Sequence, residues 1–167
     1  MKKGFTLVEL LVVALIVGVL AGIALPQYQK AVKKSELARY MTAVRALENA
    51  EKAYFLANGT YTQELDKLVI GLPFTHCSKQ TQVYGQYYEC PGGIRYGVFN
   101  DGCNVQAGDA NIRYTHVLQD FLGNGVNFKA GDVACYSKGG LARKTCKLLG
   151  AHGTEKKGTG WDYIYVM

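Results

Sequence analysis

The feature that most constrains this chain is an apolar segment near its amino terminus, residues 5–25. The segment reads FTLVELLVVALIVGVLAGIAL, and Glu9 is its only charged residue. As a helix it would rise roughly 31 Å, close to the ~30 Å hydrocarbon core of a bilayer. We therefore expect a helix that can cross a membrane.

Two conventional membrane roles fit this segment. A cleaved secretory signal has a basic start, an apolar stretch and small residues before the cut, and residues 22–24, Gly-Ile-Ala, supply the last of these. Against a signal stands Glu9, because a carboxylate costs ~2.5–3.5 kcal/mol near the centre of a membrane helix. A permanent signal anchor tolerates Glu9 if its side chain reaches the interface, where an anion also suits a helix amino terminus.

A third interpretation comes from residues 3–10, KGFTLVEL, where the apolar helix starts. They resemble the leader and mature start of type IV pilins and of the related pseudopilins of type II secretion. The resemblance implies that residues 1–4 are a leader, that a membrane prepilin peptidase cuts after Gly4, and that the new amino terminus, Phe5, is methylated. The glutamate of this family, fifth after the cut, falls on Glu9.

The chemistry of the segment agrees with polymerisation. A free Phe5 amine and the Glu9 carboxylate would be two uncompensated charges in lipid, and pairing them between neighbouring subunits removes both penalties. The small residues Gly18 and Gly22 lie on one face and let helices approach closely, although glycine is common in any membrane helix. Pro26 lacks an N–H, so the bond to the Gly22 carbonyl is lost and a kink or local melting is expected. By the resemblance, Gly18 and Pro26 are the family's helix-interrupting residues.

Residues 26–57 continue the helix, but as an amphipathic segment with one apolar face. This stripe consists of residues spaced three to seven apart, namely Val32, Leu37, Met41, Val44, Leu47 and Tyr54. Asn58 and Gly59 follow, and both tolerate the left-handed conformation that ends helices. We therefore expect the helix to end at about Ala57.

Residues 58–167 are expected to form a globular head. Thr62 can cap a short helix over residues 63–68, and turn residues then separate segments rich in Tyr, Val and Ile. The expected strands are residues 82–89, 94–99, 112–118 and 162–166. An antiparallel sheet laid on the apolar stripe would bury both surfaces. The predicted fold class is α+β, type IV pilin-like, with a long amino-terminal helix and a small antiparallel sheet head packed on its second half.

The chain has five cysteines, which suggest an oxidising compartment because cytosolic proteins keep thiols reduced. The head would then lie outside and the short Lys-rich end in the cytoplasm. Cys135 and Cys146 resemble the carboxy-terminal disulfide of many type IV pilins, and bridging a loop of that size stabilises by roughly 3 kcal/mol. Of the others we favour Cys77–Cys90 as the local pair with Cys103 left free, although spacing does not fix the connectivity.

The 19 basic and 13 acidic side chains give a formal charge of +6. Much of the surplus lies in residues 129–157, whose cations include Lys138, Arg143, Lys144 and Lys147. Repeated along a fibre, such a surface could attract DNA or anionic cell surfaces, with strong salt dependence. The alternative is a charged loop that is merely solvated.

Neither a catalytic nor a metal site is expected. His76 stands beside Cys77, but sequence neighbours rarely face each other productively. No Cys-x-x-Cys spacing suggests zinc, and Asp101 and Asp109 lack the D-x-D-x-D pattern of calcium loops. We therefore predict a non-enzymatic protein with no cofactor.

The resemblance implies a structural subunit that polymerises through its helix into a type IV pilus filament, for surface adhesion, twitching motility or DNA uptake. The implied partners are other pilin subunits, the prepilin peptidase, an inner-membrane platform and an assembly ATPase. The precursor would lie in the bacterial inner membrane before joining an extracellular filament. The alternatives are a type II secretion pseudopilin, whose major form usually has a calcium site and no such disulfide, a minor pilin acting as a DNA or surface receptor, and a monomeric anchored protein.

Overall fold

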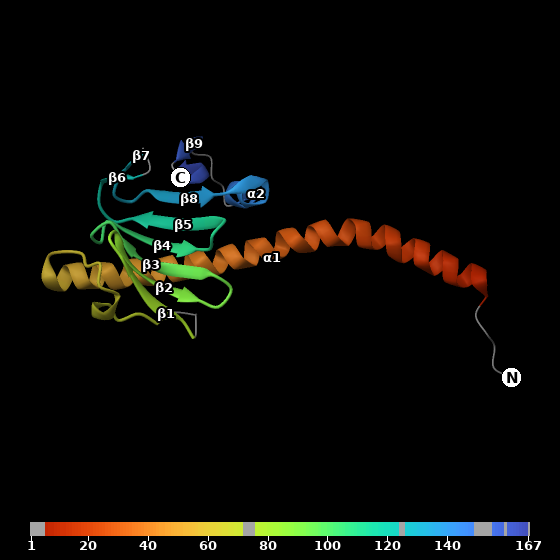
Figure 1. Ribbon diagram of the computed structural model, residues 1–167, viewed down its shortest axis with the longest axis horizontal. Helices are drawn as coiled ribbons and strands as arrows, with labels where there is room; N and C mark the ends of the chain where they lie inside the picture. The colour runs from red at the N-terminus through yellow and green to blue at the C-terminus, as the bar shows by residue number, and fades with distance from the viewer. Residues whose placement is uncertain (1–5, 72–75, 124–125, 149–154, 159, 167) are drawn as a thin grey trace. The chain divides into compact units, whose positions relative to one another are not determined.

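The computed structural model describes residues 6–71, 76–123, 126–148, 155–158 and 160–166 (Figure 1). The chain divides into two compact units, Met1–Ser35 and Glu36–Met167. The helix α1, Leu7–Asn58, contributes residues to both units. The predicted helix is therefore confirmed within the described residues, and its carboxy-terminal end differs by one residue.

In the first unit, α1 has no core of its own. Every large apolar side chain from Leu7 to Leu25 is exposed, and the least exposed, Val12, still shows 45% of its surface. By length and composition, α1 is the one helix among the described residues that could cross a membrane. Pro26 lies inside an unbroken helix, so the predicted local melting is wrong. The hydrogen bonds on either side keep the helix continuous where one is missing, and the kink stays a prediction.

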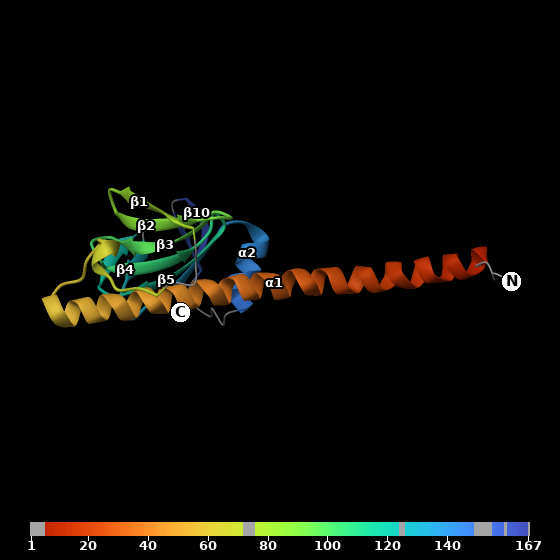
Figure 2. The ribbon, with the colours of Figure 1, turned by 90° about the horizontal axis from the view of Figure 1, so that it is seen from below.

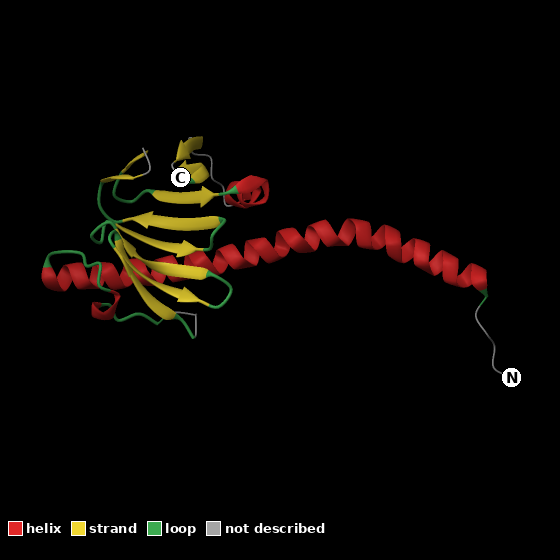
Figure 3. Cartoon of the chain, viewed as in Figure 1, coloured by secondary structure: helices red, strands yellow, loops and turns green. Residues whose placement is uncertain are grey.

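The second unit is built on an antiparallel sheet with the strand order β1-β2-β3-β4-β5-β8-β10-β9 (Figure 3). Its strands are β1 Ser78–Gln82, β2 Gly85–Cys90, β3 Ile94–Phe99, β4 Asn104–Gly108, β5 Ile112–Val117, β8 Val133–Ser137, β9 Glu155–Gly158 and β10 Trp161–Val166. The short strands β6 Phe121–Gly123 and β7 Val126–Phe128 form a separate hairpin. Two further helical elements are the 3-10 turn η1, Leu65–Lys67, and α2, Gly139–Leu148.

One face of the sheet packs on residues 36–58 of α1 (Figure 2). The helix contributes a stripe of almost fully buried side chains, Leu37, Tyr40, Ala43, Val44 and Leu47. Alternate residues of the central strands meet this stripe, among them Val98, Val105 and Tyr114, because successive strand residues point to opposite faces. The α+β class, with an antiparallel sheet packed on the amphipathic part of the helix, is confirmed.

The opposite face of the sheet carries a second apolar cluster that we did not predict. It contains Val117, Val126, Phe128, Ala134, Tyr136 and Ile164. The β6–β7 hairpin supplies two of these residues and lies over β8 and β10, so this end of the sheet is covered on both faces. The hairpin strands are only three residues each, too short for the alternation that identifies a strand in sequence.

Three of the four predicted strands are confirmed. Residues 94–99 coincide with β3, while β5 and β10 match their predictions to within one residue. The single strand predicted over residues 82–89 is wrong, because a turn at Val83 and Tyr84 divides this region into β1 and β2, which pair as a hairpin. Both turn residues are exposed strand formers, so composition hides the turn, and the positive φ of Gly85 marks the start of β2.

Two helical expectations also change. The short helix predicted over residues 63–68 is only the turn η1; the Thr62 hydroxyl accepts the Glu64 N–H at 3.1 Å and turns the chain before it. The segment between Cys135 and Cys146, which we expected to be a charged loop, contains α2. The N–H of its first residue, Gly139, donates to Asp162 Oδ2 at 2.7 Å. This cap lies 23 positions away, beyond what a local sequence pattern can reveal.

Candidate functional site: the exposed helix and the disulfide-bonded head

α1 begins with a reciprocal cap formed by Thr6 and Glu9. The Thr6 N–H and hydroxyl both donate to Glu9 Oε2 at 2.8 Å, and the Glu9 N–H donates to Thr6 Oγ1 at 3.3 Å. This is the capping box, Thr-x-x-Glu. From the sequence we predicted only a charge-pairing role for Glu9. Its second role, as a helix cap, could have been found from the three-residue spacing between Thr6 and Glu9.

The cap leaves Glu9 able to make a further contact. Both side-chain bonds use Oε2, and an ionised carboxylate has about four acceptor positions over its two oxygens. The residues predicted for cleavage and methylation, Gly4 and Phe5, lie outside the described residues. The pairing of Glu9 with a Phe5 amine of another subunit therefore stays a proposal.

The backbone at Gly18 and Gly22 is open within the described chain. A side-chain carbon built on either glycine would meet nothing within 4 Å. Both residues lie on the exposed part of α1, where small residues allow a second helix to approach closely. The assembly roles expected of Gly18, Gly22 and Pro26 remain predictions, because they concern contacts between subunits.

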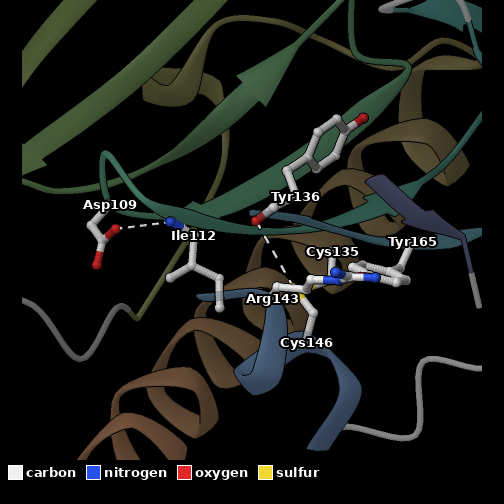
Figure 4. The surroundings of a disulfide bond; sticks show 7 residues. All are labelled: Asp109, Ile112, Cys135, Tyr136, Arg143, Cys146 and Tyr165. Atoms are coloured by element: carbon white, nitrogen blue, oxygen red, sulfur yellow. Dashed lines mark hydrogen bonds between the residues drawn. A yellow bond between two sulfur atoms is a disulfide. The ribbon is translucent and has the colours of Figure 1, made fainter. Parts of the chain in front are cut away.

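Two disulfides join the cysteines that the sequence favours as pairs. Cys135 in β8 is bonded to Cys146 in α2, and both are fully buried (Figure 4). Cys77 is bonded to Cys90 at the end of β2. Cys103 has a free thiol. Burial raises the pKa of this thiol, which makes it less reactive than an exposed cysteine.

The fold gives Arg143, one of the predicted patch cations, a packing role. Its Nε donates to the Tyr165 hydroxyl at 3.1 Å (Figure 4). Its guanidinium carbon lies 4.3 Å from the centre of the Tyr163 ring, a cation–π contact. Arg143 thus ties α2 to β10 beside the Cys135–Cys146 disulfide.

The other patch cations do not form one uniform surface. Lys138 precedes α2, and its Nζ lies 5.1 Å from the centre of the Trp161 ring. Lys144 and Lys147 are exposed and lie about one turn apart on α2. The structure therefore brings Lys144 and Lys147 together on a solvent-facing side of a helix, while Lys138 is held against an aromatic side chain of β10.

Glu48 connects α1 to the sheet through a contact with His116 that we did not predict, in addition to the expected pair with Lys52. Its Oε2 lies 2.6 Å from His116 Nδ1, and its Oε1 accepts the Lys52 ammonium at 2.6 Å. The second ring nitrogen of His116 lies 3.3 Å from the Tyr114 hydroxyl. Burial raises the pKa of Glu48, but the bonds from Lys52 and His116 outweigh this effect and hold the pKa below its usual range.

A second acid of α1, Glu51, is fully buried. Its Oε2 accepts the Thr62 N–H at 3.1 Å, and its Oε1 has no hydrogen-bond partner among the described residues. Burial raises the pKa of Glu51 to about 7. Glu51 follows Leu47 by four residues on the buried stripe, so a charged residue at an apolar position is the signal that could have identified it.

Asp109 has a structural role in the head. Its Oδ1 accepts the N–H groups of Asn111 and Ile112, and its Oδ2 accepts the Tyr40 hydroxyl at 3.1 Å. These bonds fix the β4–β5 turn and attach it to α1. Among the described residues no three His, Cys, Asp or Glu side chains gather as a metal site.

Comparison with known proteins identifies the amino-terminal segment. Residues 1–25 match the family model for the prokaryotic N-terminal methylation motif. A fimbrial protein of Pseudomonas aeruginosa is 44% identical over 55 residues, which are 33% of this chain and 36% of that protein. The type IV major fimbrial protein FimA of Dichelobacter nodosus is 44% identical over 50 residues, 30% of this chain and 32% of FimA.

The type IV major pilin protein PilE of Neisseria gonorrhoeae is 34% identical over 64 residues, 38% of each chain. The matches thus span about a third of the length of these curated relatives. No solved structure matches the chain. In its methylation motif and its amino-terminal third, the chain is similar to type IV pilins, a family of structural rather than enzymatic proteins.

Proposed function

We propose that this chain is a structural pilin subunit that polymerises through α1 into a filament. The observation that carries the proposal is the exposed apolar surface of residues 7–25. Exposed apolar area costs roughly 25 cal/mol per Å² in water, so this segment needs either lipid or other copies of itself. In a membrane precursor the segment would be surrounded by lipid, and after the subunit joins a filament it would pack against other copies.

Cleavage after Gly4 and methylation of Phe5 would create the contact that sets the register of assembly. The new amine and the Glu9 carboxylate are both costly in an apolar medium unless they pair. The Thr6 cap fixes the Glu9 side chain close to the start of the helix. A subunit that enters in the wrong register would leave both charges unpaired, and its binding would be weaker.

The partners of such a subunit follow from this route. A prepilin peptidase would cut the precursor in the bacterial inner membrane, with the amino terminus in the cytoplasm and the disulfide-bonded head outside. An inner-membrane platform and an assembly ATPase would build the extracellular filament, which would serve surface adhesion, twitching motility or DNA uptake. The type II secretion pseudopilin is the alternative within the same family resemblance.

The charge and the capping role of Glu9 can be separated by three variants. Glu9→Gln removes the charge but keeps an oxygen that can accept the Thr6 bonds, whereas Glu9→Ala removes both. Thr6→Ala removes the two hydroxyl bonds of the cap but keeps the backbone bond and the charge. Filaments sheared from cells that produce each variant are collected by sedimentation and compared with the amount of processed protein in the membrane.

We expect Glu9→Gln and Glu9→Ala to yield no sedimentable filament although processed protein is present, and Thr6→Ala to assemble. Filaments of Glu9→Gln would contradict the proposal, because the carboxylate would then act only as a helix cap. Loss of filament in Thr6→Ala alone would lead to the same conclusion.

A minor pilin that acts as a DNA receptor is the second candidate function. The exposed cations Lys144 and Lys147 on α2 favour it, since phosphate binding by such side chains needs no base contact. The double variant Lys144→Glu, Lys147→Glu should weaken DNA binding at low salt at least tenfold, and Lys144→Arg, Lys147→Arg should leave it unchanged. Equal binding by both pairs would remove this candidate.

A further inference from the structure

The sheet face that points away from α1 has an uncovered part next to the β6–β7 hairpin. Here a small pocket, open to solvent, is lined by Gln82, Tyr87, Arg95, Phe99, Gln106 and Arg113. Gln82 comes from β1, and the other lining residues alternate along β2 to β5 with the core residues that meet α1. The pocket therefore lies on the side of the sheet opposite the helix.

Arg113 is the unusual member of this pocket. Its side chain is half-buried, and its Nη1 donates to Gln106 Oε1 at 3.2 Å. Within the described ranges no carboxylate forms an ion pair with it. Burial lowers the pKa of Arg113, the expected result when a guanidinium loses water and gains no counter-ion. Its remaining N–H donors are therefore available to an anion.

Arg95, the other guanidinium of the pocket, behaves differently. Its Nε and Nη2 donate to Glu89 Oε1 at 2.9 and 2.7 Å, so its charge is already neutralised. The pocket thus offers a single uncompensated cation. One negative charge would balance it, whereas a polyanion such as DNA needs a row of unpaired cations.

Trp161, next to this pocket, contacts two cations. The Arg113 guanidinium carbon is 4.9 Å, and Lys138 Nζ is 5.1 Å, from the centre of its ring. Cation–π contact stabilises each charge only partly.

The remaining walls of the pocket suit a ring that carries hydroxyl groups. Tyr87 and Phe99 stack with ring centres 6.1 Å apart. Tyr87 is buried and Arg95 lies over its ring, so Phe99 forms the more exposed part of the apolar wall. The Tyr87 hydroxyl accepts the Gln82 amide at 3.4 Å, so its own proton is free to donate. Aromatic walls with a few fixed polar groups are typical of small-molecule sites.

We propose that this pocket binds a single carboxylate-bearing sugar ring, with the carboxylate on Arg113 and the ring against Phe99. The guanidinium and carboxylate geometries allow two parallel hydrogen bonds. The ring hydroxyls would meet the Tyr87 and Gln82 side chains. A filament built from this subunit would then carry one acidic-sugar site on each head.

The only tryptophan of the chain, Trp161, provides the assay. Its fluorescence is measured on the full, unassembled chain in a non-ionic polyoxyethylene detergent, since a detergent with a sugar headgroup would compete. The probes are sodium D-glucuronate, D-glucose and sodium acetate at matched ionic strength. We expect a saturable change with glucuronate and none with glucose or acetate over the same concentrations.

Variants test the assignment of Arg113. Arg113→Met should raise the glucuronate dissociation constant at least tenfold, the loss expected for a charge-assisted pair of hydrogen bonds. Arg113→Gln, which keeps a donor toward Gln106 and is the more conservative change for folding, should do the same. Arg45→Met removes an exposed arginine of α1 and should leave the dissociation constant unchanged.

Three results would overturn the proposal. They are the absence of a saturable change with glucuronate, an equal response to acetate, and unchanged glucuronate binding in either Arg113 variant that retains the wild-type unfolding temperature. Because the measurement uses unassembled protein, failure of filament formation in the Glu9 variants would not affect it.

Discussion

Glu51 gives a stability prediction whose size can be worked out from the structure. The side chain is fully buried in the core between α1 and the sheet, with one bond from the Thr62 N–H and no hydrogen-bond partner for Oε1 among the residues described. Its pKa rises from 4.5 to about 7. At 1.36 kcal/mol per pKa unit this corresponds to about 3 kcal/mol, which we reduce to about 2 kcal/mol for relaxation of the solvent and protein around the charge.

The direction in which stability changes with pH follows from whether the folded or the unfolded state holds the proton. Between pH 4.5 and about 7 the folded state keeps a proton on Glu51 that the unfolded state has released. The free energy of unfolding therefore falls as the pH rises through this window. Below it the acid is neutral in both states, and above it the full cost of the buried charge is present.

Glu51→Gln removes this pH dependence, because the amide does not ionise. We expect the variant to be more stable than wild type by about 2 kcal/mol at about pH 8 and to differ little at about pH 4. The measurement is urea unfolding of the full chain in detergent, followed by near-ultraviolet circular dichroism across this pH range. Glu64→Gln, at an exposed site of the head, serves as the control and should follow wild type at each pH. A stability difference between Glu51→Gln and wild type that is constant with pH would refute the reasoning.

Two further predictions concern the head. Replacing both Cys135 and Cys146 by Ser should lower the free energy of unfolding by about 3 kcal/mol, because the unfolded chain regains the freedom of the closed loop; a urea midpoint equal to that of wild type would contradict this. Tyr40→Phe removes the bond to Asp109 Oδ2 while Asp109 keeps its backbone bonds, so we expect a loss of about 1 kcal/mol. An unchanged urea midpoint for this variant would mean that the Tyr40 bond only replaces one to water.

The sequence predicts those parts of the fold whose pattern is local. The strand at residues 94–99 is bounded by glycine and asparagine and matches β3, and the apolar stripe of α1 predicts its buried face, including Leu37, Val44 and Leu47. The α2 helix is not predictable in this way. Its first N–H is capped by Asp162, and Arg143 packs on Tyr163, so both contacts come from β10.

The candidate functional residues show the same division between features that a local pattern predicts and features that depend on distant residues. The role of Glu9 as a membrane charge follows from composition, and its capping bond with Thr6 follows from spacing. The half-buried state of Arg113 does not follow from either, because it depends on Trp161 and Gln106, which reach it from β10 and β4. The pairing of strands that are distant in sequence decides which cations face solvent and which pack against other side chains.

The most direct test of the proposed function is the mass of the amino-terminal peptide of the protein recovered from the cell surface. A filament subunit made by the proposed route begins at Phe5 and carries one methyl group on its amine. A peptide that still begins at Met1, or one that begins at Leu25 after ordinary signal cleavage, would contradict assembly through an amine paired with Glu9.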